Sequence, residues 1–488
     1  MEKLVQAIRS LFTSYSAEEI LSIEKLPQSG SIRWYFRVYH GGGSCIATYG
    51  NNVLEKDTFI YFSRHFRKSG IPVPEIYAIS PDGTIYLQED FGDESLLNRL
   101  ENRGFTPEVY ALFQKSLKAL AYLQIKGDEQ LDYSRCITSS EFGKQAIMSD
   151  LLYFKYYFLD TLQIPYDKEK LIDDFEVLSN YLTKVEHKYF MFRDFQSRNI
   201  MIRDEAVYFI DYQGGMKGAL QYDVASMLWQ ARAELPEAWK EGLLDDYIGY
   251  VEELTELKID RKVFISQYYG YVLIRLLQVL GAYGFRGLFE RKAHFLSSIP
   301  LALRNLRWFV LNKEIGVEFP EFSRLLNIIV EDEIISRFES VKASEDTPLT
   351  VCINSFSYKK GLPKDLSGNG GGFIFDCRGV LNPGRIEEYK SYTGRDRLVI
   401  EYLEQRTKMI DFLNSVYNIV SISVEDYIQR GFEHLQVNFG CTGGQHRSVY
   451  AAEALAKYLK NKYNVKVKIS HIEQEAKNWI NGPALKEA

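Results

Sequence analysis

The feature that most constrains the fold of this chain is a short strand–loop–strand segment that interrupts long helical patterns. Helical periodicity runs from Thr106 to about residue 185 and resumes after the segment through Leu311. Between these patterns, residues 199–202 and 207–210 are apolar and β-rich, as short strands are. Such a chain has to hold one polar loop and two short strands inside a helical body. The loop that opens the segment reads Phe192-Arg193-Asp194-Phe195-Gln196-Ser197-Arg198-Asn199.

The first 90 residues show a different pattern, that of strands and tight turns. Residues 32–39 are rich in β-branched and aromatic side chains, and the glycines 41–43 followed by residues 45–49 predict a hairpin. Residues 84–88 predict a further strand, and residues 55–68 predict a helix. A small β-rich lobe, followed by a large helical lobe with one strand–loop–strand insert, predicts the α+β bilobal fold of a protein kinase.

A second, smaller domain is predicted after a polar linker. Lys342 to Pro348 is polar and closed by proline, which indicates a boundary near residue 345. Strands alternate with helices beyond it, and this alternation predicts a small α/β domain. We therefore expect a kinase-like domain at residues 1–320, a helical connector and linker at 321–348, and an α/β domain at 349–488. The elements expected in the last are strands at Leu349–Ser355, Phe373–Asp376 and Leu435–Phe439, and helices at Leu398–Leu413 and Val449–Leu459.

Length, cysteine usage and hydropathy exclude several classes of protein. At 488 residues the chain is too long for one hydrophobic core. Its five cysteines are odd in number and form no Cys-x-x-Cys pair, which argues against a disulfide framework or zinc cluster and favours a reducing cytoplasm. The N-terminus lacks an apolar signal core, and the most apolar run, Tyr271 to Leu280, is short and contains Arg275. We expect neither secretion nor a membrane span.

Charge is divided unevenly along the chain. The net charge is −6, but residues 347–488 hold 19 basic and 15 acidic side chains. This local excess suggests that the C-terminal part meets an anion. An excess of this size does not by itself indicate nucleic acid.

The loop has the spacing of residues that phosphoryl transfer requires, namely a carboxylate that orients the attacking hydroxyl and groups that bind the metal. Asp194 and Asn199 are five residues apart, as in a kinase catalytic loop. Asp211 follows at the end of an apolar strand, where kinases carry a metal-binding Asp. An isolated Asp and Asn would be read as a surface turn, and the strand and second Asp favour the catalytic interpretation. Asp223, which opens the next helix, is either its N-cap or a contact of the catalytic loop.

With these residues in place, residues 1 to about 320 resemble the aminoglycoside phosphotransferase and choline kinase family, and within it the cell-wall amino-sugar kinases of the AmgK type. The resemblance implies ATP-dependent phosphorylation of the C1 hydroxyl of N-acetylmuramate or N-acetylglucosamine in cell-wall sugar recycling. Choline, ethanolamine, another sugar or an aminoglycoside remain as alternative acceptors. The only pointer to the acceptor pocket is Gln278–Gly287, whose aromatic residues could instead fill core. The segments that carry the resemblance are Gly30–Val38, Glu89–Asp93, Arg193–Met201 and Ile210–Gln213.

The same resemblance implies roles for individual residues. Asp194 would be the catalytic base, and Asn199 and Asp211 would bind Mg²⁺. The residues that would contact ATP are Ser29, Gly30, Ser31 and Arg33 over the phosphates, and Gln88, Glu89, Asp90 and Phe91 at the hinge against adenine.

Two departures from the family pattern bear on activity. Phe192 stands where the family usually has His, and residues 45–49 offer no lysine where the third strand of a kinase places one. The AmgK type, as the resemblance implies, also lacks that lysine. A weak or inactive kinase that acts as a regulator is therefore the alternative. The possible substitutes for the lysine are Arg33, Arg37, Arg193 and Arg198, each of which could equally be a solvated strand or loop residue.

A second polar loop, Gly440 to Ser448, follows a predicted strand and precedes a predicted helix. N–H groups and the positive end of the helix dipole converge at such a loop, so it predicts a phosphate site to which His446 and Arg447 can add charge. It is not a Walker A loop, because no lysine follows at the required spacing. Two alternatives remain: a cysteine-phosphatase site built on Cys441 and Arg447, and a plain strand-to-helix turn.

Residues 349–488 resemble the C-terminal domain of the RNase adapter protein RapZ, whose N-terminal P-loop NTPase part is absent here. The resemblance implies a sensor of glucosamine 6-phosphate, weak binding of RNA, and homo-oligomers formed through this domain. The chain would then be an amino-sugar kinase that senses a hexosamine phosphate. The segments that carry the resemblance are Phe375–Arg378, Leu381–Gly384, Tyr392–Asp396 and Gly440–Tyr450, and the implied sugar-phosphate residues are Asp376, Arg378, Cys441, Thr442, Gly443, Gly444, Gln445, His446, Arg447 and Ser448.

Overall fold

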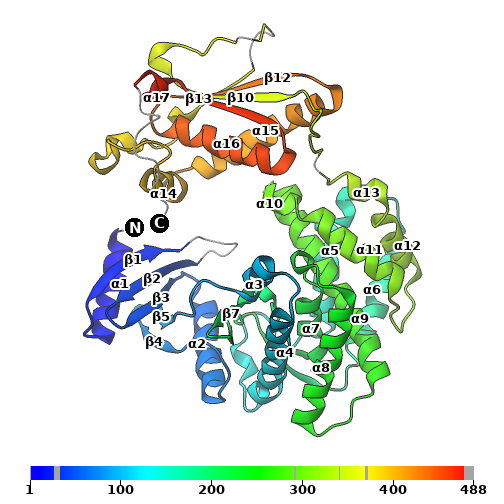
Figure 1. Ribbon diagram of the computed structural model, residues 1–488. Coiled ribbons are helices and arrows are strands. Elements are labelled where there is room, and N and C mark those ends of the chain that lie inside the picture. The colour runs from blue at the N-terminus through cyan, green and yellow to red at the C-terminus, as the bar shows by residue number, and fades with distance from the viewer. Residues whose placement is uncertain are drawn as a thin grey trace. The chain divides into compact units, whose positions relative to one another are not determined.

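The computed structural model describes residues 2–26, 33–290, 293–339, 341–365, 367–368 and 372–477. The chain forms two compact units (Figure 1). The first comprises Met1–Ala282 and Leu301–Ile335, and the second comprises Tyr283–Pro300 and Ser336–Ala488.

The first unit begins with a five-stranded antiparallel sheet in the order β1-β2-β3-β5-β4. Phe36, Val38 and Leu87 belong to one buried cluster with Ile8 and Phe12 of helix α1. The hairpin predicted at residues 41–49 is present, whereas α1 is absent from the sequence-based expectation. The bounds are α1 Glu2–Tyr15, β1 Ile20–Lys25, β2 Trp34–His40, β3 Gly43–Tyr49, β4 Ile76–Ile79 and β5 Ile85–Glu89.

Helix α2 (Val53–Lys68) joins the small lobe to the chain that follows the strand–loop–strand insert. It begins after the N-cap Asn52, whose side chain accepts a hydrogen bond from the N–H of Glu55 at 3.2 Å. On its buried face, Phe59 stacks on Tyr212 with ring centroids 5.0 Å apart. α2 is therefore packed directly against the residue that follows Asp211.

Helices make up most of the remaining first unit. α4 begins as predicted, with Thr106 as N-cap and Pro107 in the first turn. One helical stretch, Arg261–Phe289, is long and apolar enough to cross a membrane by length and composition alone, but more than half of its most apolar window is buried inside the protein. The helices are α3 Leu96–Arg103, α4 Pro107–Asp128, α5 Lys144–Tyr157, α6 Lys168–Leu182, α7 Leu220–Leu228, α8 Glu237–Thr255, α9 Arg261–Tyr283, α11 Ile299–Asn312, α12 Pro320–Ile329 and α13 Asp332–Ser336.

The predicted strand–loop–strand insert is present as two small antiparallel sheets. β7 (Ile200–Arg203) pairs with β8 (Ala206–Phe209), and β6 (Lys188–Met191) pairs with β9 (Met216–Ala219). The β7–β8 register sets the first residue of β7 opposite the last residue of β8. This hairpin brings the end of the loop Phe192–Asn199, the predicted catalytic loop, close to the chain that leads to Asp211.

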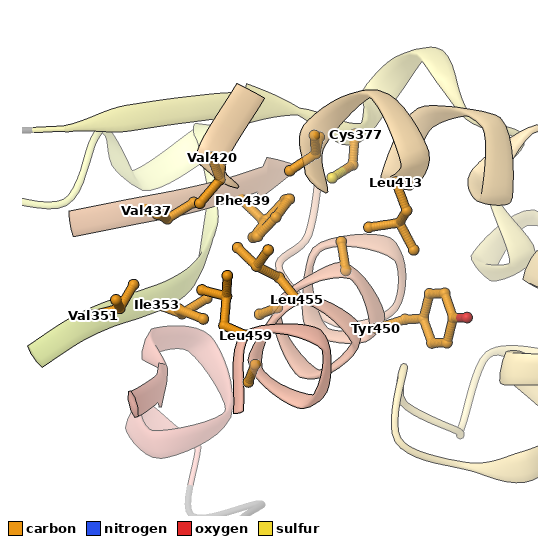
Figure 2. Packing of buried hydrophobic residues seen from close by; sticks show 14 of the residues in the cluster. Val351, Ile353, Cys377, Leu413, Val420, Val437, Phe439, Tyr450, Leu455 and Leu459 are labelled. Atoms are coloured by element: carbon orange, nitrogen blue, oxygen red, sulfur yellow. The ribbon is translucent and has the colours of Figure 1, made fainter. Parts of the chain in front are cut away.

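The second unit is built on a four-stranded parallel sheet in the order β11-β12-β10-β13. Helices α15 and α16 lie along one side of this sheet (Figure 1). Their apolar side chains meet those of β10 and β12 in a core that includes Val351, Val437, Val420 and Leu455 (Figure 2). The bounds are α10 Ala293–Leu296, β10 Thr350–Ser357, β11 Phe373–Asp376, α14 Arg397–Arg406, α15 Met409–Arg430, β12 His434–Cys441, α16 Arg447–Tyr463, β13 Lys466–His471 and α17 Ile472–Ala476.

The single helix predicted at residues 398–413 is wrong in one respect, because the structure has two helices there. α14 ends at Arg406, and α15 starts at Met409. Thr407 between them is extended, and its hydroxyl accepts a hydrogen bond from the N–H of Met409 at 3.1 Å, which satisfies one of the free N–H groups in the first turn of α15. The fold class itself is confirmed: a kinase-like unit with an antiparallel β lobe and a helical lobe, and a separate α/β unit with a parallel sheet.

Candidate functional site

Asp194 and Asn199 lie on the loop between β6 and β7 and contact each other. Asn199 Nδ2 donates to the main-chain oxygen of Asp194 at 2.9 Å and is 3.5 Å from its Oδ2. The loop turns at Arg193, whose φ of 79° is costly for a residue other than glycine; such strain clusters at functional sites. The Asp194 side chain is 32% exposed, so a substrate hydroxyl can reach it.

Asp223 holds the catalytic loop through its backbone. Its Oδ2 accepts a hydrogen bond from the N–H of Phe192 at 2.8 Å, and its Oδ1 accepts one from the N–H of Arg193 at 2.9 Å. Gln124 Nε2 also donates to this carboxylate, at 2.9 Å. Burial is the largest effect on the carboxyl and raises the pKa of Asp223 to about 7, although the hydrogen bonds favour the anion. Of its two interpretations, the loop contact is the one found, because the N-cap of α7 is Ala219.

Phe192, which stands where the resemblance implies His, points into the core. Its ring makes edge contacts with those of Phe195 and Tyr212, with centroids 5.3 and 5.9 Å away. The carboxylate of Asp223 binds the backbone N–H at this position instead. The loop is thus held without a polar side chain at residue 192.

Asp211 is brought to the loop by the β7–β8 hairpin, because the N–H of Ile210 donates to the main-chain oxygen of Asn199 at 3.1 Å. Gln213 Nε2 donates to Asp211 Oδ1 at 2.9 Å, while Gln213 Oε1 is buried and has no partner in the described part of the chain. Carboxylate and amide oxygens are the hard ligands that Mg²⁺ prefers. The donor chemistry of Asn199, Asp211 and Gln213 therefore fits magnesium. No group of three or more His, Cys, Asp or Glu residues that could hold a metal occurs among the described residues.

Arg33 supplies a positive charge that the third strand lacks. Its Nη2 is 2.9 Å from Asp211 Oδ1, and its Nε is 3.4 Å from Glu55 Oε1 on α2. Protein kinases pair their strand lysine with a helix glutamate in a comparable way. The other three candidate substitutes have carboxylate partners elsewhere: Arg37 pairs with Asp90 and Asp93, Arg193 with Asp150, and Arg198 with Asp194.

The side chains of the predicted hinge, Gln88 to Phe91, are largely engaged within the protein. Glu89 and Asp90 form ion pairs with arginines at 2.9 and 2.6 Å, and Phe91 stacks on a tyrosine ring with centroids 4.3 Å apart. Gln88 is buried, and its Oε1 lacks a partner within the described ranges. Contacts of Glu89 and Asp90 with a nucleotide would therefore come from the backbone. The predicted phosphate-covering residues Ser29, Gly30 and Ser31 lie outside the described residues.

Arg275 is a site residue that sequence reasoning missed. It lies on α9, is 5% exposed, and donates from Nη2 to Asp194 Oδ1 at 2.9 Å and from Nη1 to Gln278 Oε1 at 2.7 Å. In the sequence it shows only as a charge inside an apolar run, a signal that a buried ion pair is needed. Nearby buried polar atoms that lack a partner in the described structure are Asp150 Oδ2, Arg193 Nη1, Tyr222 Oη and Arg275 Nε.

The C-terminal loop follows β12 and leads into α16, as predicted. β11 pairs with β12 so that Asp376 lies opposite Gly440, which brings Asp376 and Arg378 beside the loop. These two residues form an ion pair at 2.6 Å, and the Arg378 guanidinium lies 3.9 Å from the ring centroid of Tyr358. The loop is thus at the carboxyl edge of a parallel sheet, where α/β proteins bind ligands.

Three side chains of this loop brace neighbouring backbone. Gln445 Nε2 donates to the carbonyl oxygens of residues 390 and 392 at 2.9 and 2.8 Å, and His446 Nε2 is 3.0 Å from the carbonyl oxygen of residue 389. Arg447 Nη1 donates to three carbonyl oxygens, of residues 377, 378 and 380, at 3.3, 3.2 and 2.7 Å. Burial lowers the pKa of His446. This direction disfavours a positive charge on the His446 ring, so its part in binding an anion stays a prediction.

The remaining loop residues form a tight turn around a buried sulfur. Cys441 Sγ is 3.2 Å from the N–H nitrogen of Gly444 and 3.2 Å from Ser448 Oγ, and Ser357 Oγ donates to the carbonyl oxygen of Thr442. At Gly444, where φ is 65°, an added Cβ would lie 2.4 Å from Glu473 Cγ; at Gly443 there is open space. Since Arg447 Nη1 is bound to carbonyl oxygens, the Cys-x5-Arg pattern does not leave that N–H for a phosphate beside Cys441.

Two protein families match the chain. The family described as phosphotransferase enzyme family matches residues 31–257, which include Asp194, Asn199 and Asp211. The family described as RapZ C-terminal domain matches residues 349–475, which include the C-terminal loop.

Individual relatives are similar to parts of this chain. A nucleotide-binding protein of Endomicrobium trichonymphae is 37% identical over 139 residues, or 28% of this chain and 46% of that protein. The nucleotide-binding protein FN1089 of Fusobacterium nucleatum is 30% identical over 244 residues, or 48% of this chain and 77% of that protein. The chain thus spans less than half of the first relative. A choline/ethanolamine kinase family protein of Mesorhizobium loti has 13% identity and a TM-score of 0.43, over 63% of this chain and 92% of that one. The chain carries a domain of the phosphotransferase enzyme family at residues 31–257 and a RapZ C-terminal domain at residues 349–475.

Proposed function

We propose that this protein transfers phosphate from ATP to the anomeric hydroxyl of N-acetylmuramate or N-acetylglucosamine in the cytoplasm, within cell-wall sugar recycling. The kinase part is residues 1–320, joined by a connector at 321–348 to a sensing domain at 349–488. The observation that carries the proposal is the loop itself. Asp194 and Asn199 are in contact, the hairpin brings Asp211 to them, and Asp223 binds the loop backbone.

In the proposed reaction, the carboxylate of Asp194 accepts a hydrogen bond from the acceptor hydroxyl and orients its oxygen towards the phosphate. Asn199 and Asp211 would hold Mg²⁺ through their side-chain oxygens, and Gln213 would be a further oxygen donor. When bound, Mg²⁺ neutralises charge that develops on the transferred phosphoryl group. Arg275 fixes the orientation of the Asp194 carboxylate through its contact at 2.9 Å.

The charges around Asp194 favour a neutral or acidic acceptor over choline or ethanolamine. Arg275 and Arg198 are both paired with Asp194, and Arg193 precedes it. A quaternary ammonium or amine placed against this carboxylate would meet the guanidinium groups of Arg198 and Arg275, whose repulsion disfavours a cation. A sugar has hydroxyls that can both donate and accept hydrogen bonds here. Of the predicted pointer Gln278–Gly287, Gln278 is linked to Asp194 through Arg275, and residues from Tyr283 onward belong to the second unit.

The proposal is tested by ADP release across a panel of sugars and amino alcohols. N-acetylmuramate and N-acetylglucosamine should give the highest kcat/KM, and choline and ethanolamine should give background rates. The matched variant is Asp194→Asn, which preserves shape and removes the carboxylate. Turnover of the sugars by this variant at the rate of the intact protein would exclude Asp194 as the base, and a preference for choline would exclude the acceptor assignment.

For the second unit we propose binding of a hexosamine phosphate at the loop 441–448, with Asp376 and Arg378 at its rim. Two features support the binding of an anion at this loop: the loop lies at the carboxyl edge of the sheet, and it leads into the N-terminus of α16. Homo-oligomers through this unit, and RNA as a weak partner, belong to the same proposal. Calorimetric titration with glucosamine 6-phosphate should give a saturable heat that Arg378→Ala reduces. The absence of heat with the intact protein would remove the sensing role.

One observation favours the second candidate function, a weak kinase that works mainly as a regulator. Both acids that the reaction would use are already paired with arginines, Asp194 with Arg275 and Asp211 with Arg33. Addition of hexosamine phosphates to the ADP-release assay separates the two functions. A measurable basal rate that the sugar phosphate changes supports a regulated enzyme, whereas glucosamine 6-phosphate binding with no turnover of any acceptor supports the regulator.

A further inference from the structure

Arg33, which immediately precedes β2, joins two elements that a kinase must keep together. Its guanidinium contacts Glu55 of α2 and Asp211, which lies beyond β8. The Arg33 side chain is only 12% exposed, but that of Asp211 is 36% exposed, so the pair is accessible from the Asp211 side. A ligand that takes over Asp211 can therefore reach this ion pair.

Space for Arg33 is made by a glycine on the neighbouring strand. Gly50 follows β3, and a Cβ added there would lie 3.2 Å from Arg33 Cγ. A side chain at residue 50 would thus press on the aliphatic part of Arg33. The side chains of β3 itself, residues 43–49, include no cation. The positive charge of the small lobe next to Asp211 therefore comes from an adjacent position and not from the third strand.

We propose that Arg33 is an exchangeable phosphate-binding residue, which pairs with Asp211 in the absence of nucleotide and moves to the polyphosphate when a divalent cation binds Asp211. This inference rests on the proposed function and names a device within its site. Asp211 Oδ1 cannot accept Arg33 and bind a metal through the same lone pairs at once. Arginine stays charged at any working pH, and phosphate oxygens match the geometry of the Nη2 that leaves Asp211. Glu55 holds the Arg33 Nε while Nη2 changes partner.

The exchange makes metal and nucleotide help each other to bind. A metal that arrives alone has to break the Arg33–Asp211 pair, and a nucleotide that arrives alone finds Arg33 engaged with Asp211. When the two arrive together, each relieves the cost of the other. If the exchange occurs, removal of Arg33 should therefore change the affinity for the metal and the affinity for the nucleotide in opposite directions.

The test uses the full-length protein with Arg33→Met, without any acceptor. Mn²⁺ binding, measured by electron paramagnetic resonance in the absence of nucleotide, should become about three- to fivefold tighter, since Asp211 no longer has to release an ion pair. AMP-PNP binding, measured by calorimetry in saturating Mg²⁺, should become about tenfold weaker, since a charge-assisted contact with phosphate is lost. Arg33→Lys should keep most of the nucleotide affinity.

Two further variants serve as controls. Arg99→Met removes another buried arginine that contacts two carboxylates, Glu94 at 2.6 Å and Glu205 at 2.7 Å, and should leave both affinities unchanged. Gly50→Ala should shift both affinities in the same directions as Arg33→Met but by less. Circular dichroism melting of each variant checks that it is folded.

Unchanged affinities in Arg33→Met, or a shift of both in the same direction, overturns the exchange. Because neither measurement needs an acceptor, its failure is distinct from failure of the proposed function. Opposite shifts without phosphorylation of any acceptor would leave the exchange standing and remove the sugar kinase. Phosphorylation of an acceptor without opposite shifts would do the reverse.

Discussion

The two polar loops of this protein use similar residue types in opposite ways. At the loop Phe192–Asn199 and the neighbouring chain after β8, the acids Asp194 and Asp211 are each about one third exposed, and their ionic partners are arginine side chains. In the C-terminal loop, Gln445, His446 and Arg447 are bound to main-chain carbonyl oxygens. A ligand can displace a side chain from an ion pair far more easily than it can displace a brace between two backbone segments. Similar residue types in a loop can therefore be reacting groups in one place and residues that hold the backbone in another.

The energies follow the same division. A partly exposed ion pair contributes about 0–1 kcal/mol to stability. A buried hydrogen bond contributes about 0.5–1.5 kcal/mol, and an orphaned partner costs about 1–3 kcal/mol. Substitutions in the catalytic loop should thus reduce turnover more than stability, and substitutions in the C-terminal loop should reduce stability first.

The largest effect is expected from Asp211→Asn. Loss of the carboxylate removes charge from the proposed metal site, so kcat should fall about 10²- to 10³-fold while the free energy of unfolding changes by less than about 1 kcal/mol. The measurements are steady-state ADP release in excess Mg²⁺ and urea unfolding. Asp204→Asn, in the turn between β7 and β8, is the control and should behave as the intact protein. A large loss of stability with unchanged kcat would show that Asp211 has a structural role, which would contradict the difference drawn between the two loops.

Asp223→Asn should lower both stability and kcat, because Asp223 accepts the hydrogen bonds that hold the backbone of the loop Phe192–Asn199. An asparagine can accept only one of the two backbone N–H bonds well, so we expect about 1–3 kcal/mol less stability and a kcat about tenfold lower. Asp246→Asn is the matched control, since Asp246 also accepts a hydrogen bond from a glutamine, at 2.8 Å, but on the surface helix α8. Full activity and full stability in Asp223→Asn would show that the loop does not need this anchor.

Gln445→Ala should lower the stability of the second unit by about 1–2 kcal/mol, since two carbonyl oxygens lose their donor. Urea unfolding followed by near-ultraviolet circular dichroism measures it. Gln405→Ala, exposed on α14, is the control and should change stability by less than about 0.5 kcal/mol. If Gln445→Ala instead abolished glucosamine 6-phosphate binding at unchanged stability, Gln445 would be a ligand residue and the comparison would need revision.

The smallest expected effect is a difference in pH dependence between the units. The folded-state pKa of Asp223 is raised to about 7, so its contribution to stability is complete below about pH 4 and is lost as pH rises to about 7, by up to about 1.4 kcal/mol per pH unit. The folded-state pKa of His446 is lowered, so its contribution is present above about pH 6.5 and is lost as pH falls. Between pH 8 and pH 6, the first unit should gain from Asp223 and the second should lose from His446.

Unfolding curves at pH 6, 7 and 8 for Asp223→Asn and His446→Gln measure these slopes. Each variant should flatten the pH dependence of its own unit and leave that of the other unchanged. Equal slopes in the intact protein and both variants would contradict the assignment of these two groups.

The catalytic loop was predictable because its signal is local. The spacing of Asp194, Asn199 and Asp211 along one strand–loop–strand segment can be recognised in the sequence without knowledge of distant contacts. The role of Asp223 was predictable only as one of two options, since a helix-opening aspartate is usually a cap. The contacts of Arg33 and Arg275 join residues far apart in the sequence, 178 and 81 positions from their acidic partners, and periodicity carries no such information.

In the second unit, strand and helix order was predictable and side-chain use was not. The pattern at residues 440–448 indicates a strand-to-helix turn, but it cannot say whether Arg447 faces a ligand or a carbonyl oxygen. The break at Thr407 was missed because apolar periodicity continues across it, and only the hydrogen bond of the threonine hydroxyl marks the new helix start.

The most direct test of the central claim is phosphate transfer to a defined acceptor by the intact protein and by Asp194→Asn. Incubation with ATP, Mg²⁺ and N-acetylmuramate or N-acetylglucosamine, followed by phosphorus nuclear magnetic resonance, reports both the product and the position of the phosphate. We predict a sugar 1-phosphate with the intact protein and a rate about 10²- to 10⁴-fold lower with Asp194→Asn. Equal rates for the two proteins, or no phosphorylated sugar with the intact protein, would contradict the account.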